Sequence, residues 1–278
     1  MALKRHLVQP ENSKNPERNS ARPWLERGAA LAAVAVIAAF ILWPPYSFLQ
    51  KADFIGYAVC HRIDHRSFHM AGRQLPLCVR CTGTYLGVLA GLGSFWLRGR
   101  RRSTGFPPVS VLGALVVFWI LFGLDGLNSY LTLLGASHAY APHHLLRVLT
   151  GCLNGVALSI LIWPVFNFSL WKNSDSQAVV RNLRELGGIV AAAWIMALIA
   201  YTETSFLLYP LAIISAFGVL LMLTLVNSML VAIIMGQEAT ALNWRDAALP
   251  LVLGLALSMI EIGILDFVRF NLLPPLPF

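Results

Sequence analysis

The residues most able to do chemistry gather in one short stretch of an otherwise apolar chain. Three of the four cysteines fall between residues 60 and 81, together with three of the seven histidines and four arginines. Reactive polar side chains beside hydrophobic segments are costly to bury without partners, so this density indicates a site. The cluster consists of Cys60, Cys78, Cys81, His61, His65, His69, Arg62, Arg66, Arg73 and Arg80.

Metal binding is the first chemistry that these residue types suggest, because zinc prefers thiolate and imidazole ligands. Cys78 and Cys81 have the Cys-x-x-Cys spacing that supplies half of a tetrahedral site, and Cys60 offers a third sulfur. The fourth ligand would be a histidine. Neighbours such as Cys60 and His61 rarely both reach one ion, so three other histidines are equal candidates: His65, His143 and His144.

Thiol–disulfide exchange is the second chemistry that the cysteines could support. Cys78 and Cys81 would then be the exchanging pair, Cys60 a partner thiol, and a membrane quinone the electron acceptor. A static disulfide or simple packing of these side chains is also compatible with the spacing. Cys152 stands alone in an apolar segment, which is typical of a cysteine that packs.

An anionic small molecule is a third kind of partner, and it would make the protein a transporter or an enzyme. Arginine side chains could hold its phosphate or carboxylate group, or offset thiolate charge. Charged residues inside a membrane normally pair, so we expect an ion pair between Asp125 and Arg147, with a structural or a functional role. The anion-binding or structural set is Arg62, Arg66, Arg73, Arg80, Asp125 and Arg147.

The composition indicates which elements must position these residues. Of the 278 residues, 57% are hydrophobic and only 12% are charged, against roughly 25% in soluble domains. This predicts an integral membrane protein, surrounded by the lipid bilayer. The net charge of +8 is explained by basic residues in segments that flank the membrane, and no nucleic-acid recognition module is present.

The hydropathy pattern predicts an all-α, polytopic transmembrane bundle of about seven helices, each near the 20 residues that cross a membrane. Residues 1–27 are interpreted as a flexible cytoplasmic tail, 28–166 as a four-helix unit that carries the site, and 167–278 as three further helices. The expected spans are 28–49, 75–97, 109–134, 142–166, 186–202, 207–235 and 247–267.

The basic loops predict the orientation in a prokaryotic cytoplasmic membrane. They follow the second, fourth and sixth expected spans, on the same side as the basic N-terminal tail. The positive-inside rule then places the N-terminus in the cytoplasm and the C-terminus outside. The cysteine cluster faces outward, although its own arginines contradict the rule locally.

Helix signals indicate how the cluster is presented. Pro76 suits the first turn of the second span, which puts Cys78 and Cys81 on one face at a helix N-terminus. Pro142 likewise starts the fourth span, at the same membrane face, with His143 and His144 in its first turn. Glycines spaced by four predict close contact between helices, at Gly83, Gly87, Gly91, Gly151 and Gly155.

The motifs resemble those of a known family. Cys-His-Arg and Arg-Ser-Phe from residue 60, followed by Gln-Leu-Pro-Leu-Cys-x-Arg-Cys-Thr-Gly-x-Tyr-x-Gly from residue 74, are similar to DUF2085, uncharacterised prokaryotic multi-pass membrane proteins. Asp125-Gly126, Leu146-Arg147 and Thr150-Gly151 resemble its second block, and the likeness covers about residues 50–165. The resemblance implies a shared set of cysteine, arginine and aspartate positions, without an activity and without a named protein partner.

Overall fold

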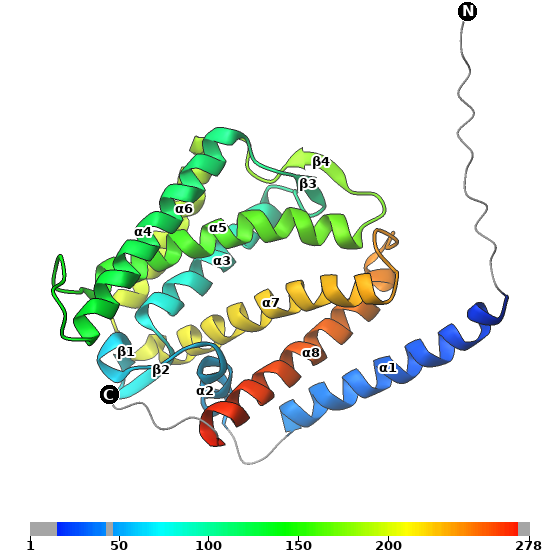
Figure 1. The fold of residues 1–278 in the computed structure, drawn as a ribbon, viewed down its shortest axis with the longest axis horizontal. Helices are drawn as coiled ribbons and strands as arrows, with labels where there is room; N and C mark the ends of the chain where they lie inside the picture. The colour runs from blue at the N-terminus through cyan, green and yellow to red at the C-terminus, as the bar shows by residue number, and fades with distance from the viewer. Residues whose placement is uncertain (1–15, 43–46, 272–278) are drawn as a thin grey trace, which may run out of the picture.

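The computed structural model describes residues 16–42 and 47–271, which form a helical bundle with two small sheets (Figure 1). Seven of its helices coincide with the seven expected spans, which confirms the all-α fold class. The helices are α1 (Pro16–Leu42), α2 (Phe48–Val59), α3 (Val79–Leu97), α4 (Val109–Leu133), α5 (His144–Leu170), α6 (Leu183–Tyr201), α7 (Leu208–Ile234) and α8 (Trp244–Asn271), with 3-10 turns η1 (Asp64–Arg66) and η2 (Ser205–Leu207).

The centre of the bundle is the pair α3 and α5, which cross in close backbone contact through the predicted glycines. A Cβ atom added at Gly87 would lie 2.3 Å from the carbonyl oxygen of Cys152, and one added at Gly155 would lie 1.8 Å from that of Thr84. No side chain fits at such distances, so glycine is required for this approach. The contact fixes the N-termini of both helices relative to each other, and the site is built there.

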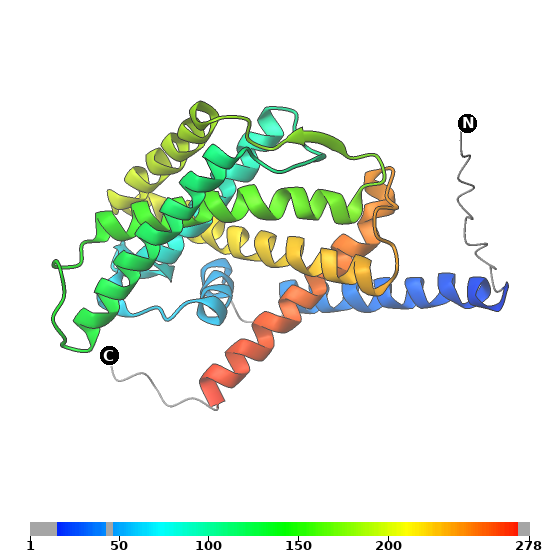
Figure 2. The same ribbon diagram turned by 45° about the horizontal axis from the view of Figure 1, so that its top comes forward.

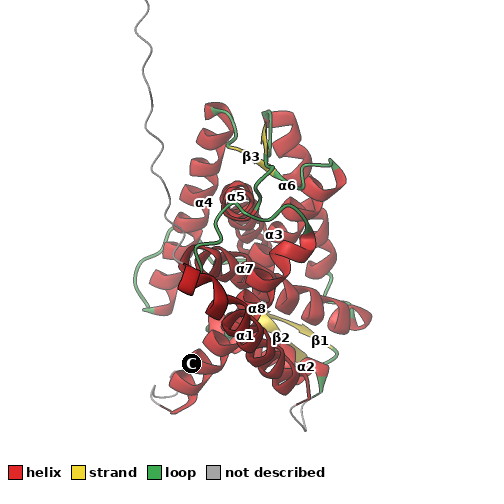
Figure 3. Ribbon diagram, turned by 90° about the vertical axis from the view of Figure 1, so that its right-hand side faces the viewer, coloured by secondary structure: helices red, strands yellow, loops and turns green. Residues whose placement is uncertain are grey.

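The other helices surround this pair. Viewed along the bundle, α4 and α6 lie on opposite sides of α3 and α5 (Figure 3). Helix α7 packs against both central helices, α8 packs against α7, and α1 packs against α8. The short helix α2 fills the corner between α7 and α8 at one end of the bundle (Figure 1).

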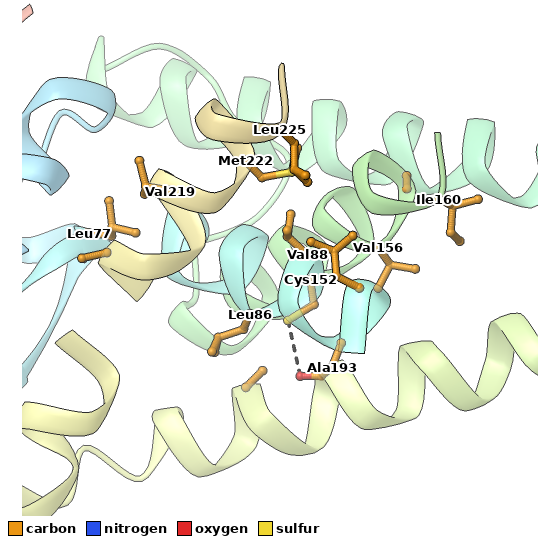
Figure 4. Close-up of a cluster of buried hydrophobic side chains, with 14 of the residues drawn as sticks. Leu77, Leu86, Val88, Cys152, Val156, Ile160, Ala193, Val219, Met222 and Leu225 are labelled. Atoms are coloured by element: carbon orange, nitrogen blue, oxygen red, sulfur yellow. Dashed lines mark hydrogen bonds between the residues drawn. The ribbon is translucent and has the colours of Figure 1, made fainter. Parts of the chain in front are cut away.

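The interior between α3, α5, α6 and α7 is apolar. Figure 4 shows Cys152 among Leu86, Val88 and Val156, with its sulfur directed at the carbonyl oxygen of Ala193, 3.5 Å away. Cys152 is fully buried, which agrees with its interpretation as a packing residue.

Five helical segments of the described chain are long and apolar enough to cross a membrane. Helix α4 is the most outward-facing of them, and it exposes large apolar side chains such as Val117, Leu124 and Leu127. Apolar exteriors of this kind suit lipid and not water. The five segments are Val109–Leu133, His144–Leu170, Leu183–Tyr201, Ser205–Ile234 and Trp244–Asn271.

The two small sheets mark opposite ends of the bundle (Figure 2). At one end β1 (Ser67–Met70) and β2 (Arg73–Cys78) form an antiparallel hairpin between α2 and α3. At the other end β3 (Ser103–Gly105) pairs in parallel with β4 (Asp175–Ala178), and Trp171 bridges to Ala241. The three basic loops therefore meet at one end, as their expected common side requires.

Three boundaries differ from the sequence-based expectation. The first helix extends back to Pro16, while residues 1–15 of the predicted tail lie outside the described chain. Helix α2 was not expected, because its residues continue the apolar run, although Ser47 and Gln50 form a capping box at its start. The second expected span begins at Val79 and not at residue 75, since residues 73–78 form β2.

Candidate functional site

The cysteine cluster is assembled by the end of α2, the β1–β2 hairpin and the start of α3. Cys60 is the C-cap of α2 and Cys78 is the N-cap of α3, both with extended backbone, and Cys81 lies in the first turn of α3. The expectation that Pro76 begins the helix is wrong. Pro76 lies inside β2, because Ala71 and Gly72 adopt positive φ angles of 52° and 72° and turn the chain into a hairpin.

A close backbone contact brings the two halves of the cluster together. A Cβ atom added at Gly56 of α2 would lie 2.0 Å from the carbonyl oxygen of Pro76 in β2. Glycine therefore allows α2 to rest directly on the hairpin. As a result the backbone N–H of Cys78 donates a hydrogen bond to the sulfur of Cys60 at 3.2 Å, although 18 residues separate them.

The three sulfur atoms lie in mutual hydrogen-bond contact, and all three cysteines are free thiols. The thiols of Cys78 and Cys81 donate to the sulfur of Cys60, which holds the pKa of Cys60 far below its ordinary value. The same arrangement raises the pKa of Cys78, whose proton is engaged by Cys60. Cys60 is therefore the cysteine of the three that loses its proton most readily.

His61 is the histidine that joins this cluster. A ring nitrogen of His61 and the sulfurs of Cys60 and Cys78 all lie within 4.8 Å of one another. Adjacent residues reach one point here because Cys60 is extended and Arg62 turns the chain with a φ of 48°. Partial burial and the nearby positive charges of Arg66 and Arg80 lower the pKa of His61, which favours the neutral imidazole.

The other three candidate histidines make different contacts. His143 is the N-cap of α5 and accepts a hydrogen bond from the backbone N–H of Leu145. The Nε2 atom of His144 lies 3.2 Å from the carbonyl oxygen of His65. His65 itself is exposed in η1. The contact between His144 and His65 joins the start of α5 to η1, so the two polar regions share one end of the bundle, as expected.

Arg62 and Arg73 hold the hairpin onto α2 through a shared carboxylate. Arg62 forms an ion pair with Asp53 at 3.1 Å, and Arg73 forms a second one at 2.5 Å. The guanidinium of Arg62 also lies 4.2 Å from the ring centre of Tyr57. These two members of the predicted arginine set therefore contribute to the structure of the site.

The predicted ion pair between Asp125 and Arg147 is wrong, because Asp125 pairs with Arg80 instead. The phenol of Tyr140 donates to the same carboxylate at 2.9 Å. Arg147 donates from Nε to the hydroxyl of Ser129 at 3.4 Å. The packing explains the exchange, since α5 contacts both α3 and α4 and so places Arg80 of α3 within reach of Asp125.

Sequence reasoning missed the residue that secures the cysteine segment from the far end of the chain. Arg269 of α8 donates hydrogen bonds to the carbonyl oxygens of Tyr57 at 2.6 Å, of His61 at 2.8 Å and of Cys60. No local signal could reveal it, because 209 residues separate Arg269 from Cys60. The capping box at Ser47 could have revealed α2, and with it Asp53.

Comparisons with known proteins agree with the motif resemblance. The family model described as "Predicted membrane protein (DUF2085)" matches residues 60–161, which include the three clustered cysteines and Asp125. An uncharacterized protein of Methanothermobacter thermautotrophicus is 31% identical over 103 residues, which make up 37% of this chain and 83% of that protein. An uncharacterized protein of Methanocaldococcus jannaschii is 27% identical over 128 residues, 46% of this chain and 76% of that protein.

No solved structure matches the chain. The matched residues run from the end of α2 through the hairpin and across most of α5. They contain the three clustered cysteines and also Arg66, Arg80 and Arg147. Asp53 and Arg269, which support the cysteine segment from α2 and α8, lie outside them. With the cysteine motif, the apolar helices and both relatives in agreement, the chain belongs to the DUF2085 family of predicted membrane proteins.

Proposed function

We propose that this membrane protein binds a zinc-like metal ion through Cys60, Cys78 and Cys81, with His61 as the fourth ligand. The observation that carries the proposal is that the sulfurs of Cys60 and Cys78 and a ring nitrogen of His61 lie within 4.8 Å of one another, while the thiol of Cys81 contacts both sulfurs. Tetrahedral zinc, with bonds of about 2.3 Å to sulfur and 2.0–2.1 Å to nitrogen, needs ligand atoms about 3.5–3.8 Å apart. The ligand atoms of Cys60, Cys78 and His61 lie within 4.8 Å of one another and reach that geometry with small side-chain movements.

The chemistry of the donor set fits the same ion. Zinc binds thiolates and neutral imidazole, and the surroundings lower the pKa of both Cys60 and His61, which favours these two forms. The Nδ1 atom of His61 accepts a hydrogen bond from the backbone N–H of Ile63 at 3.0 Å. Because a neutral imidazole has one nitrogen lone pair, metal binding by His61 would replace this contact.

Metal analysis combined with thiol titration tests the proposal. Protein purified from membranes without chelator should contain about one metal ion per chain, and Cys78→Ser should lose it. Cys152→Ser is the matched control, because Cys152 is buried in α5 among apolar side chains and should leave the metal content unchanged. Protein that carries no metal while its thiols stay reduced, or a Cys78→Ser variant that holds as much metal as the wild type, would contradict the proposal.

A membrane thiol–disulfide oxidoreductase is the second candidate, favoured by the contact between the sulfur of Cys60 and the thiols of Cys78 and Cys81. In that case two of the three cysteines, such as Cys78 and Cys81, would lose two electrons and two protons as a disulfide forms. A quinone would take up both and become a quinol. Adding quinone should then lower the titratable thiols of metal-free protein by two per chain, whereas an unchanged count rejects this candidate.

We further infer that the end carrying the site faces the outside of the cell, with the N-terminus in the cytoplasm and the C-terminus outside. The three basic loops at the opposite end support this orientation through the positive-inside rule. An alkaline phosphatase fused after Phe278 should be active, because that enzyme folds only outside the cytoplasm. If the reporter were active only when fused in the loop that contains β3, the opposite orientation would be correct.

A further inference from the structure

Three guanidinium groups from three different elements converge on one serine beside the cysteine cluster. Arg66 of η1 donates to the carbonyl oxygen of Ser129 at 2.9 Å. Arg80 of α3 donates to the Ser129 hydroxyl at 2.9 Å, and Arg147 of α5 donates to the same hydroxyl at 3.4 Å. The arrangement follows from the fold, because η1 and the first turns of α3 and α5 meet at one end of the bundle (Figure 1).

The charges in this group do not balance. Among the described residues, one carboxylate forms an ion pair with this group. It belongs to Asp125, and its partner is Arg80. Arg66 is 9% exposed and Arg147 is 6% exposed, so water neutralises little of their charge. A buried net charge of about two positive units is unfavourable unless an anion accompanies it.

Several of the N–H donors have no acceptor within the described part of the chain. The Nε atoms of Arg66 and Arg80 are buried without a hydrogen-bond partner. The contact to Ser129 uses the Nε atom of Arg147 and leaves its two terminal nitrogens free. Folded proteins pair nearly all buried donors, and a cluster of unpaired ones indicates a ligand.

We propose that Arg66, Arg80 and Arg147, together with the hydroxyl of Ser129, bind the phosphate group of a ligand. A phosphate monoester carries a charge between −1.5 and −2 near neutral pH, which matches the excess positive charge. Its tetrahedral oxygens can accept from guanidinium groups that approach from three directions, as η1, α3 and α5 provide. The proposal is independent of the metal site, because none of these four residues is a proposed metal ligand.

Two sources of this phosphate fit the position of the site. One is a soluble phosphate compound that reaches the end of the bundle from water. The other is a phospholipid headgroup, since Ser129 and Asp125 lie on α4, whose neighbouring residues Leu124, Leu127 and Tyr130 are more than half exposed on the lipid-facing side. The chemistry that recognises the phosphate is the same in both cases.

Binding measurements on the full-length protein test the proposal with two probes. Purified protein in detergent is titrated with inorganic phosphate by equilibrium dialysis. In parallel, the protein is placed in phosphatidylcholine nanodiscs in which roughly one lipid in five is phosphatidic acid. Native mass spectrometry then measures how much phosphatidic acid the protein retains. Phosphate binding in detergent supports the soluble source, and selective retention of phosphatidic acid supports the headgroup.

Matched variants assign the binding to these arginines. Arg147→Gln and Arg66→Gln should each lower the affinity at least tenfold for whichever of the two probes binds the wild type. Arg147→Lys should recover part of that affinity. Arg101→Gln should bind like the wild type, because Arg101 is exposed at the opposite end, next to Trp96. The melting temperature serves as the folding control for each variant.

Three outcomes would overturn the proposal. The first is wild-type protein that binds neither probe. The second is Arg147→Gln and Arg66→Gln protein that binds as tightly as the wild type while its melting temperature is unchanged. The third is an equal loss of affinity in Arg101→Gln, which would mean that the net charge of the protein and not this cluster attracts phosphate.

Discussion

The two ends of the bundle hold buried arginines in opposite circumstances. At the end formed by β3 and β4, Arg100 donates to both carboxylate oxygens of Glu185, at 2.6 and 2.7 Å, and to the carbonyl oxygen of Val179 at 2.7 Å. At the end formed by the hairpin, Arg66 and Arg147 are buried to a similar degree, and neither pairs with a carboxylate of the described chain.

This difference distinguishes an arginine that stabilises the fold from arginines that are available to a ligand. A buried arginine with a bidentate carboxylate and a carbonyl acceptor is satisfied within the protein, so it fixes the fold. Arginines buried in excess of their carboxylates lower stability unless a ligand is bound. The hairpin end also carries Cys60, whose pKa is lowered by contact with two further thiols, so both unusual features occur at the same end.

The largest effect on stability is expected at the end formed by β3 and β4, where the buried arginine has a carboxylate partner. Glu185→Ala leaves the buried guanidinium of Arg100 without its carboxylate, and we expect a loss of about 2–3 kcal/mol in the free energy of unfolding. Denaturant unfolding in detergent measures it. A loss below about 0.5 kcal/mol would mean that this pair behaves like an exposed ion pair, and the comparison between the ends would fail.

The next effect concerns the support of the cysteine segment by α8. Arg269→Gln removes the hydrogen bonds to the carbonyl oxygens of Cys60 and His61, so the metal affinity should fall about 10- to 100-fold. Competition with a chromogenic chelator gives the affinity, and Arg101→Gln is the control. Unchanged affinity would show that the cysteine segment is held in place without α8.

The smallest effect on stability is expected at the end formed by the hairpin, where Arg147 has no carboxylate partner in the described chain. Arg147→Gln removes one of three adjacent positive charges and a single 3.4 Å contact, so the free energy of unfolding without phosphate should change by less than about 1 kcal/mol. The same denaturant experiment as for Glu185→Ala reports it. A loss as large as that of Glu185→Ala would indicate that Arg147 is satisfied within the protein.

The parts of the fold that could be predicted are those with a local sequence signal. The apolar runs located seven helices, and the glycines spaced by four located the contact between α3 and α5. The Cys-x-x-Cys motif was correctly assigned to the start of α3. The short hairpin before it was missed, because a six-residue strand that runs directly into an apolar helix is too short to show a clear periodicity.

The parts that could not be predicted depend on contacts between distant segments. Arg80 was available to Asp125 only after α5 had been packed against both α3 and α4, so the sequence favoured the partner on the adjacent helix. Arg269 reaches Cys60 from the last described helix. The choice of His61 depends on the turn at Arg62, a backbone conformation that sequence alone did not indicate.

X-ray absorption spectroscopy of the zinc-loaded protein tests the central claim most directly, because it counts the ligand atoms around the metal. The account predicts three sulfur atoms at about 2.3 Å and one nitrogen at about 2.0–2.1 Å. It also predicts that His61→Ala replaces the nitrogen without removing a sulfur. A shell of oxygen and nitrogen atoms without sulfur would contradict the account.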